Sequence, residues 1–136
     1  MSAIAVWLII KGALAVLGGW LGWALGGLDA LLSALVVFMA VDYVTGFMCA
    51  VLDKKLCSNI GFRGIFRKVM VMVLVGIGHA IDVFIHTGEA VRTMVIVFYL
   101  SNEGISILEN AVKVGLPIPE RLKDILSSIK EGGKKK

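Results

Sequence analysis

Four long apolar blocks constrain the fold of this sequence more than any other feature. They cover approximately residues 3–25, 28–52, 69–85 and 91–108. Each block has close to the roughly 20 residues that a helix needs to cross a bilayer. With 58% hydrophobic and only 18% charged residues, a chain of 136 residues has more apolar surface than a small soluble domain can bury. The sequence therefore predicts an all-α integral membrane protein with about four transmembrane helices, and it argues against a soluble enzyme or a disordered chain.

Lys and Arg residues are distributed unevenly between the connections. The first turn, residues 26–29, has none, and the third connection, residues 86–92, balances Arg92 with Glu89. Most of the others follow the second or the fourth block: Lys54, Lys55, Arg63, Arg67 and Lys68, then Lys113, Arg121, Lys123, Lys130 and Lys134 to Lys136. Because positively charged loops stay in the cytoplasm, we expect both termini in the cytoplasm and two short turns outside. Anionic lipid headgroups explain the net charge of +4 better than a nucleic acid does.

The two ends of the chain have different patterns. At the start, no Lys or Arg precedes the first apolar run and Lys11 interrupts it, which argues against a cleaved signal peptide. After the fourth block, Pro117 and Pro119 precede a segment that repeats apolar residues with helical spacing: Leu122, Ile125, Leu126 and Ile129. This segment predicts a short amphipathic helix, either on the cytoplasmic membrane face or packed on its own bundle. We therefore expect a transmembrane domain over residues 1–115 and a cytoplasmic helix with a basic tail over residues 116–136.

Several ionisable side chains lie inside the predicted spans: Lys11, Asp42, His79, Asp82 and Glu103. A charge there costs at least about 2.5–3.5 kcal/mol on insertion scales, so each needs a compensating interaction. From depth alone, we expect Lys11 to pair with Glu103 or Asp42. The alternatives are that Lys11 extends to the interface and that the acids only hydrogen-bond between helices. His79 and Asp82 share a helix face, which indicates an interhelical polar contact more than a proton relay.

One side of the fourth block is polar along its whole length. Its polar residues follow helical spacing: Asn102, Ser106, Glu109 and Asn110, with Glu103 beside them. A helix surrounded by lipid would not carry such a side, so this side should face water, other helices or neighbouring subunits. We interpret it as the polar face of a pore or of an oligomer.

No pattern of catalytic or metal-binding residues is present. The sequence lacks HExxH, GxSxG, Walker and Cys-x-x-Cys motifs, and neither histidine has a ligand partner at useful spacing. The two cysteines are expected to be free thiols. Gly61-x-x-Gly64, before Arg67 and Lys68, indicates a cytoplasmic loop that approaches the lipid headgroups rather than an anion site at a helix N-terminus. We therefore expect no enzyme activity, no cofactor and no metal.

In their order along the chain, several of these patterns resemble the toxin-secretion/phage-lysis holins. The elements are Asp42-x-x-Thr45-Gly46, Ser58-x-x-Gly61-x-x-Gly64 with Arg67-Lys68, Asp82, Tyr99-x-x-Asn102-Glu103-x-x-Ser106-x-x-Glu109-Asn110, and Gly115-x-Pro117-x-Pro119. No single element is specific. Their order and spacing together are specific, and they cover about residues 42–119.

The resemblance implies a protein that accumulates in the inner membrane of a phage-infected bacterium, oligomerises and forms lesions at a set time. The lesions release a muralytic endolysin, and some relatives are tied to export of a large toxin. The implied partners are membrane lipids, further copies of the chain and an endolysin that it need not bind. The spacings Gly18-x-x-x-Gly22 and Gly22-x-x-x-Gly26 agree with close helix packing in such an assembly. The same features would serve a small oligomeric ion channel or transport subunit, and a membrane scaffold without a pore is the third alternative.

Overall fold

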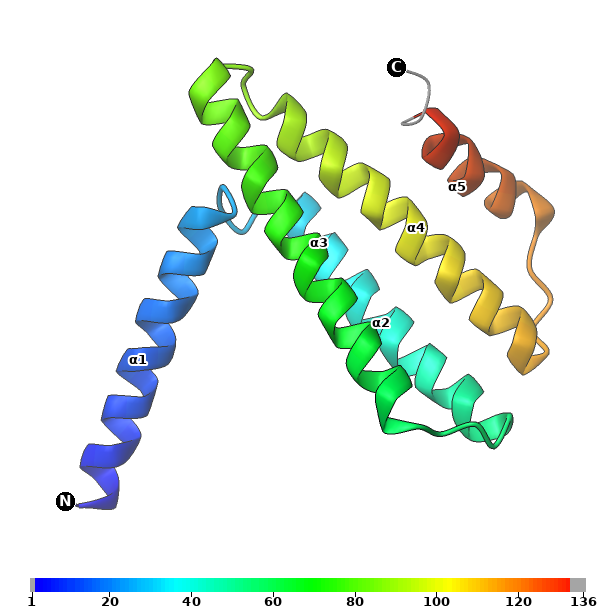
Figure 1. The fold of residues 1–136 in the computed structure, drawn as a ribbon, viewed down its shortest axis with the longest axis horizontal. Coiled ribbons are helices and arrows are strands. Elements are labelled where there is room, and N and C mark those ends of the chain that lie inside the picture. The colour runs from blue at the N-terminus through cyan, green and yellow to red at the C-terminus, as the bar shows by residue number, and fades with distance from the viewer. Residues whose placement is uncertain (1, 133–136) are drawn as a thin grey trace.

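The chain folds into helices joined by short turns (Figure 1). The computed structural model describes residues 2–132, and in that part all regular structure is helical. The helices are α1 (Ala3–Ala24), α2 (Ala30–Leu52), α3 (Ser58–Ile85), α4 (Ala90–Val114) and α5 (Glu120–Gly132). The first four are long and apolar enough to cross a membrane. The predicted all-α membrane fold with about four spans is confirmed.

The helix ends follow from local chemistry. Ser2 and Asp29 cap α1 and α2, and Asp29 Oδ1 accepts a hydrogen bond from the backbone N–H of Leu32 at 2.8 Å. A cap of this kind satisfies one of the amide groups that the first helical turn leaves free. Gly115, with a φ of 97°, ends α4 in the left-handed conformation that glycine adopts without a steric penalty. The local sequence thus accounts for the starts of α1 and α2 and for the end of α4.

Helix α3 is longer than its apolar block. It begins at Ser58, so Gly61, Gly64, Arg67 and Lys68 lie in its first three turns. The prediction that these four residues form a cytoplasmic loop was therefore wrong. The segment contains no proline, and large apolar side chains are interspersed among its polar ones. No helix-breaking proline separates this segment from the apolar block, so α3 extends back to Ser58, directly after the turn that follows α2.

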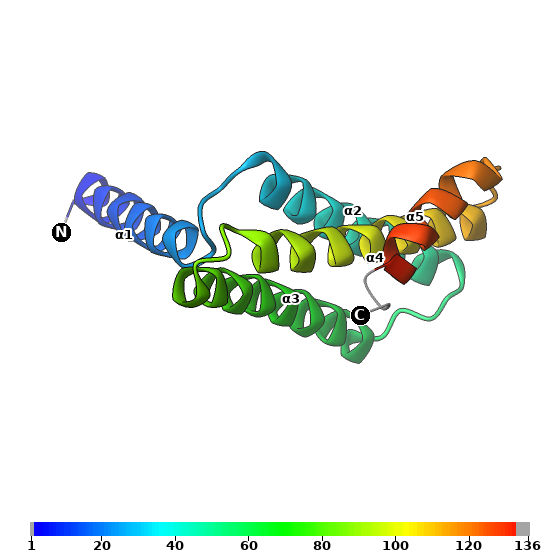
Figure 2. The same cartoon turned by 90° about the horizontal axis from the view of Figure 1, so that it is seen from above.

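Helix α4 is the central element of the bundle. It packs against α2 on one side and α3 on the other, whereas α2 and α3 make few contacts with each other. Figure 2 shows α4 between them. The apolar core is small and lies toward the end of the bundle that holds the α1–α2 and α3–α4 turns: Leu32, Leu35, Met39, Val71, Val75 and Ile96. A Cβ on Gly78 would lie 3.1 Å from the Cα of Arg92, so this glycine permits the close approach of α3 and α4.

Helix α1 stands apart from this bundle. Among the described helices it contacts only α3, near its own C-terminal end, where a Cβ on Gly76 would lie 3.6 Å from the carbonyl oxygen of Ala24. The helix, all of which the structure describes, buries none of its residues within the chain. Figure 1 shows α1 leaving the bundle at an angle, with its N-terminus far from the other helices.

Helix α5 turns back after Pro119 and packs on α4. This arrangement matches the expectation of a helix packed on its own bundle. A position on the cytoplasmic membrane face stays a prediction. Parts of the predicted segment lie outside what the structure describes, namely the side chains of Leu126, Ile129 and Lys130 and the tail Lys134 to Lys136.

Candidate functional site

Three charged side chains from three helices meet in the middle of the bundle. Lys68 of α3 places its Nζ 2.8 Å from Asp42 Oδ2 of α2 and 2.5 Å from Glu103 Oε2 of α4. The three side chains are between 8% and 17% exposed. We call Asp42, Lys68 and Glu103 the lysine–carboxylate cluster. Because two carboxylates share one ammonium group, the cluster has one formal negative charge in excess.

The lysine–carboxylate cluster continues into hydrogen bonds between α2 and α4. Asn110 Nδ2 donates to Thr45 Oγ1 at 3.0 Å and to Asp42 Oδ1 at 3.4 Å. The carbonyl oxygen of Asn110 accepts from the Cys49 Sγ–H at 3.5 Å. In a bilayer, such bonds hold helices together because lipid offers no competing partner. The predicted intramembrane residues Asp42 and Thr45 thus both bind α4.

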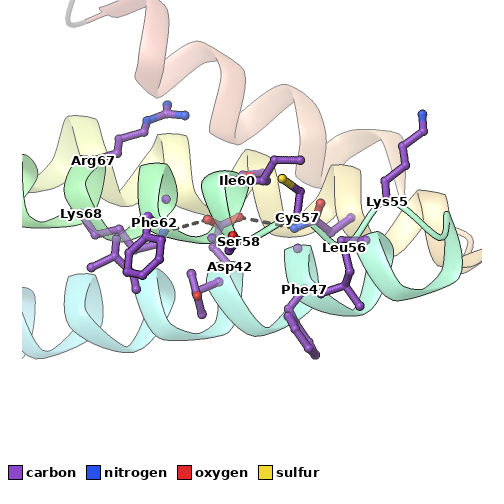
Figure 3. A pocket seen from close by; sticks show the side chains of 18 of the residues that line it. Asp42, Phe47, Lys55, Leu56, Cys57, Ser58, Ile60, Phe62, Arg67 and Lys68 are labelled. Carbon is purple, nitrogen blue, oxygen red and sulfur yellow. Dashed lines mark hydrogen bonds and ion pairs between the residues drawn. The ribbon is translucent and has the colours of Figure 1, made fainter.

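A groove opens from the lysine–carboxylate cluster to the surface between α2 and α3. It has a volume of about 660 Å³ (Figure 3). Four residues of the predicted polar face of α4 line it: Asn102, Glu103, Ser106 and Asn110. Apolar side chains such as Phe47 and Phe62 line its walls, and Lys55 and Arg67 lie at its margin. The polar side of α4 therefore borders the chain's own groove, while Glu109 is exposed.

Two glycines of α3 shape one wall of this groove. A Cβ on Gly61 would lie 3.4 Å from Tyr43 Oη, and one on Gly64 would lie 3.6 Å from Tyr43 Cε2. The ring of Tyr43 thus lies against the glycine surface of α3. These glycines act as packing positions between helices, which the pattern Gly61-x-x-Gly64 alone did not indicate.

Within one copy of the chain, Lys11 pairs with neither Glu103 nor Asp42, so the predicted pairing is wrong for the single chain. Lys68 makes both ion pairs. Lys11 lies on the exposed surface of α1, where its Nζ is 3.5 Å from the centre of the Trp7 ring. The physical reason is lateral position: α1 leaves the bundle, whereas the N-terminal extension of α3 brings Lys68 to the depth of the two acids.

A second polar cluster holds the opposite end of the bundle. Arg92 of α4 is fully buried, and its Nη1 lies 2.6 Å from Asp29 Oδ2. The Nε of Arg92 donates to the carbonyl oxygen of Leu25 at 2.6 Å, and its Nη2 donates to the carbonyl oxygen of Gly27 at 2.9 Å. We call Arg92, Asp29 and these two carbonyls the Arg92 cluster. It fixes the α1–α2 turn to α4, and the hydrogen bond from Arg92 holds the pKa of Asp29 below its usual value.

Asp82 and His79 lie next to the Arg92 cluster. Asp82 accepts hydrogen bonds from the backbone N–H groups of Val91 at 2.9 Å and Arg92 at 2.8 Å, and from the hydroxyl of Thr87. Asp82 thus caps α4 from the neighbouring helix. His79 Nδ1 is buried and, among the described residues, has no hydrogen-bond partner. A Cβ on Gly26 would lie 2.7 Å from this nitrogen and 2.8 Å from Arg92 Nε, so only glycine fits there.

Arg92 was not among the predicted site residues, because Glu89 balances its charge within the same connection. A usable signal was present: Asp29 and Arg92 are opposite charges in turns predicted to lie on the same side of the membrane. The structure brings them together and places Glu89 at the start of α4 with a left-handed backbone. Within residues 2–132, no group of His, Cys, Asp or Glu side chains could hold a metal ion.

Comparison with known proteins adds a family. The sequence model of the bacteriophage holin family matches residues 19–131 of this chain. A protein of Listeria monocytogenes is 40% identical over 118 residues, which are 87% of this chain and 84% of the relative. A 14.9 kDa protein encoded in the nagH 3' region of Clostridium perfringens is 41% identical over 121 residues, 88% of this chain and 92% of the relative. Both relatives are described as uncharacterized. No solved structure matches the chain.

Proposed function

This chain belongs to the bacteriophage holin family, and from that premise we propose that it forms lesions in the cytoplasmic membrane of its bacterial host. The family is not a family of enzymes, and the chain is a membrane protein with four helices able to span the bilayer. In this proposal, copies accumulate in the membrane, assemble at a set time and let an endolysin reach the cell wall. The endolysin need not bind the holin, since an opening of sufficient size is enough.

The observation that carries the proposal is the polar groove inside the membrane-spanning part. Glu103 and Asn110 are each 7% exposed, and both line a groove that opens between α2 and α3. A monomer inserted in lipid shields these groups with its own helices. When several copies associate, the same polar surface can bind a helix of a neighbouring copy or face water, and an assembly that encloses a water-filled opening requires polar groups of this kind inside the membrane.

Timed expression with an endolysin that lacks its own signal sequence tests the function. We expect abrupt lysis after a lag, and release of the endolysin to the cell wall only when both proteins are present. A variant in which Glu103 becomes leucine should insert and accumulate but lyse late or not at all, because the groove loses a polar group. The matched variant Glu120→Gln, which changes an exposed residue of α5, should lyse on the wild-type schedule.

The experiment also separates this function from the alternatives. A small ion channel or transport subunit would depolarise the membrane without releasing the endolysin. If the chain served toxin export instead, its expression would release a large cytoplasmic protein while the cell wall stays intact. Either outcome would replace endolysin release as the function of this chain while leaving its membership of the family unchanged.

A further inference from the structure

Helix α1 has a surface that the rest of the chain does not cover. A Cβ added at Gly12, Gly18 or Gly19 would meet no atom within 4 Å, other than its own helix backbone and chain neighbours. Lys11 is exposed on this helix, and within residues 2–132 no acidic side chain pairs with it. Apolar side chains can face lipid, but an ammonium group inside a span needs water or an anion. Within residues 2–132 the ammonium group of Lys11 contacts the Trp7 ring, 3.5 Å away, but no carboxylate, so an anionic partner would have to come from outside the chain.

The surface between α2 and α3 contains a hollow that no described helix of the chain fills. The groove at the lysine–carboxylate cluster adjoins a second hollow of about 330 Å³. The two hollows share Tyr43, Ile65 and Lys68. The second hollow is almost entirely apolar and includes Val36 and Ala40 of α2. We call the two together the α2–α3 groove: an apolar channel that leads to a cluster of charges.

Charge makes the α2–α3 groove complementary to α1. The lysine–carboxylate cluster holds two acids on one lysine, and a further positive charge beside it would neutralise the excess. The other basic residues that line the groove, Lys55 and Arg67, lie at its margin and point away from the cluster (Figure 3). Lys11 is a single positive charge in a span that otherwise contains no ionisable residue. Bringing the two together would remove both unbalanced charges from lipid, where such charges are costly.

Lys11 and the lysine–carboxylate cluster also lie at similar depths in their helices. At about 1.5 Å per residue, Lys11 lies about 12 Å from the start of α1 at Ala3. By the same rise, Asp42 lies about 15 Å from the end of α2 at Leu52, and Lys68 lies about 15 Å from the start of α3. If the N-terminus and the α2–α3 turn lie on the same side of the membrane, as the loop charges predict, these depths agree within one helical turn.

C-terminal to Lys11, small residues let the face of α1 that carries this lysine approach another helix closely. Ala15, Gly18 and Gly22 follow Lys11 at i+4, i+7 and i+11, so they share its face. Small residues let a second helix approach closely in a membrane. Helix α1 cannot reach the groove of its own chain in this fold. Its N-terminal end lies far from the ends of α2 and α3 that the α2–α3 turn joins (Figure 1). The Arg92 cluster holds the turn that sets this direction.

We propose that the α2–α3 groove of one copy binds α1 of a second copy, with Lys11 at the lysine–carboxylate cluster. This inference rests on the proposed function in so far as it describes how copies assemble. Each copy then donates one helix and receives another. Such a contact joins two different surfaces, so it can repeat from copy to copy and build a ring or a growing array. A head-to-tail contact of this kind can therefore build an assembly of many subunits.

Disulfide formation between two differently tagged copies tests the contact. One copy has Ala15→Cys on α1 and the other has Ala40→Cys in the groove, both in a background with Cys49→Ser and Cys57→Ser. We expect mild oxidation of membranes to give a covalent dimer that contains both tags. The matched control replaces Ala15→Cys by Ala13→Cys, a residue on the opposite face of α1, and should give several-fold less dimer. Lys11→Leu in the donating copy should reduce the Ala15–Ala40 dimer several-fold, although leucine inserts into lipid more easily.

Each other result would contradict the proposed contact. Equal yields from the Ala13 and Ala15 copies would mean that α1 collides at random, and no dimer would mean that lipid fills the groove. A disulfide that forms within one chain carrying both cysteines, without dimer, would place α1 in its own groove. The proposed function is judged separately. Endolysin release by the background protein without the Ala15–Ala40 dimer would overturn the contact alone, and the dimer without release would overturn the function alone.

Discussion

Helices α1 and α4 are both long and apolar enough to span a bilayer, but the structure uses them in opposite ways. The more apolar helix, α1, buries none of its residues, whereas α4 lies at the centre of the bundle. Most of the residues that α4 buries are polar: Arg92, Ser101, Glu103 and Asn110. In lipid, hydrophobicity does not bring helices together, because the surrounding chains are as apolar as leucine. Polar side chains decide which helix becomes the centre.

The largest effect that tests this comparison is expected at Lys68. In a Lys68→Met variant, two carboxylates remain in the span without their shared ammonium group. Removing one partner of a buried ion pair costs about 3–5 kcal/mol. The detergent-solubilised variant should therefore unfold at a much lower denaturant concentration than wild type. Unfolding followed by circular dichroism measures the change. Lys55→Met, at an exposed position before α3, is the control. Equal stability of Lys68→Met and wild type would show that polar pairs do not hold the bundle.

A matched pair of glycines sharpens the comparison between the two helices. In Gly78→Ala, the new Cβ would lie 3.1 Å from the Cα of Arg92, and crowding of a packed interface costs about 1–3 kcal/mol. In Gly19→Ala on α1, the Cβ meets no atom within 4 Å. That variant should keep wild-type stability or gain up to about 1 kcal/mol from helix propensity. Similar losses in both variants would mean that α1 is packed in the folded chain.

Two neighbouring polar residues of α4 provide a smaller contrast. Asn110 donates to Thr45 and Asp42, whereas Glu109 is exposed. Asn110→Ala should lose about 0.6–2 kcal/mol, the range for an interhelical hydrogen bond in a membrane. Glu109→Ala should change stability by less than about 0.5 kcal/mol. The same unfolding measurement compares the two variants. A larger loss of stability for Glu109→Ala would contradict our assignment of Asn110 to the packed side of α4 and of Glu109 to its exposed side.

The smallest expected effect is a dependence on pH at Asp29. Its pKa is lowered from 3.8 by the hydrogen bond from Arg92, so the ionised form stabilises the fold. This contribution is complete above the pKa of the unfolded chain and disappears as pH falls through the lower pKa of the folded chain. Asp29→Asn keeps a capping side chain and should be slightly less stable than wild type at pH 7. The difference should shrink as pH falls below 3.8 and through the lower pKa of the folded chain, and a constant difference would contradict the assignment.

The sequence by itself determined the elements that depend on local chemistry. A bilayer of fixed thickness requires spans of about 20 apolar residues, and the four blocks therefore appear as α1 to α4. Gly115 and the prolines after it end α4 where expected, and the helical spacing of Asn102, Ser106 and Asn110 indicated one polar side. The holin resemblance, which depends on order and spacing along the chain, agrees with the family match.

Only the tertiary structure decided which charges meet. Depth in a membrane is a single coordinate that can be counted along a helix, so the sequence placed Lys11, Asp42 and Glu103 at similar levels. Lateral position depends on how helices pack, and the packing moved α1 away and brought Lys68 of the extended α3 to the two acids. Arg92 and Asp29 met for the same reason, because the α1–α2 turn folds onto the start of α4. A residue's depth follows from its own helix, but its partner follows from the arrangement of all of them.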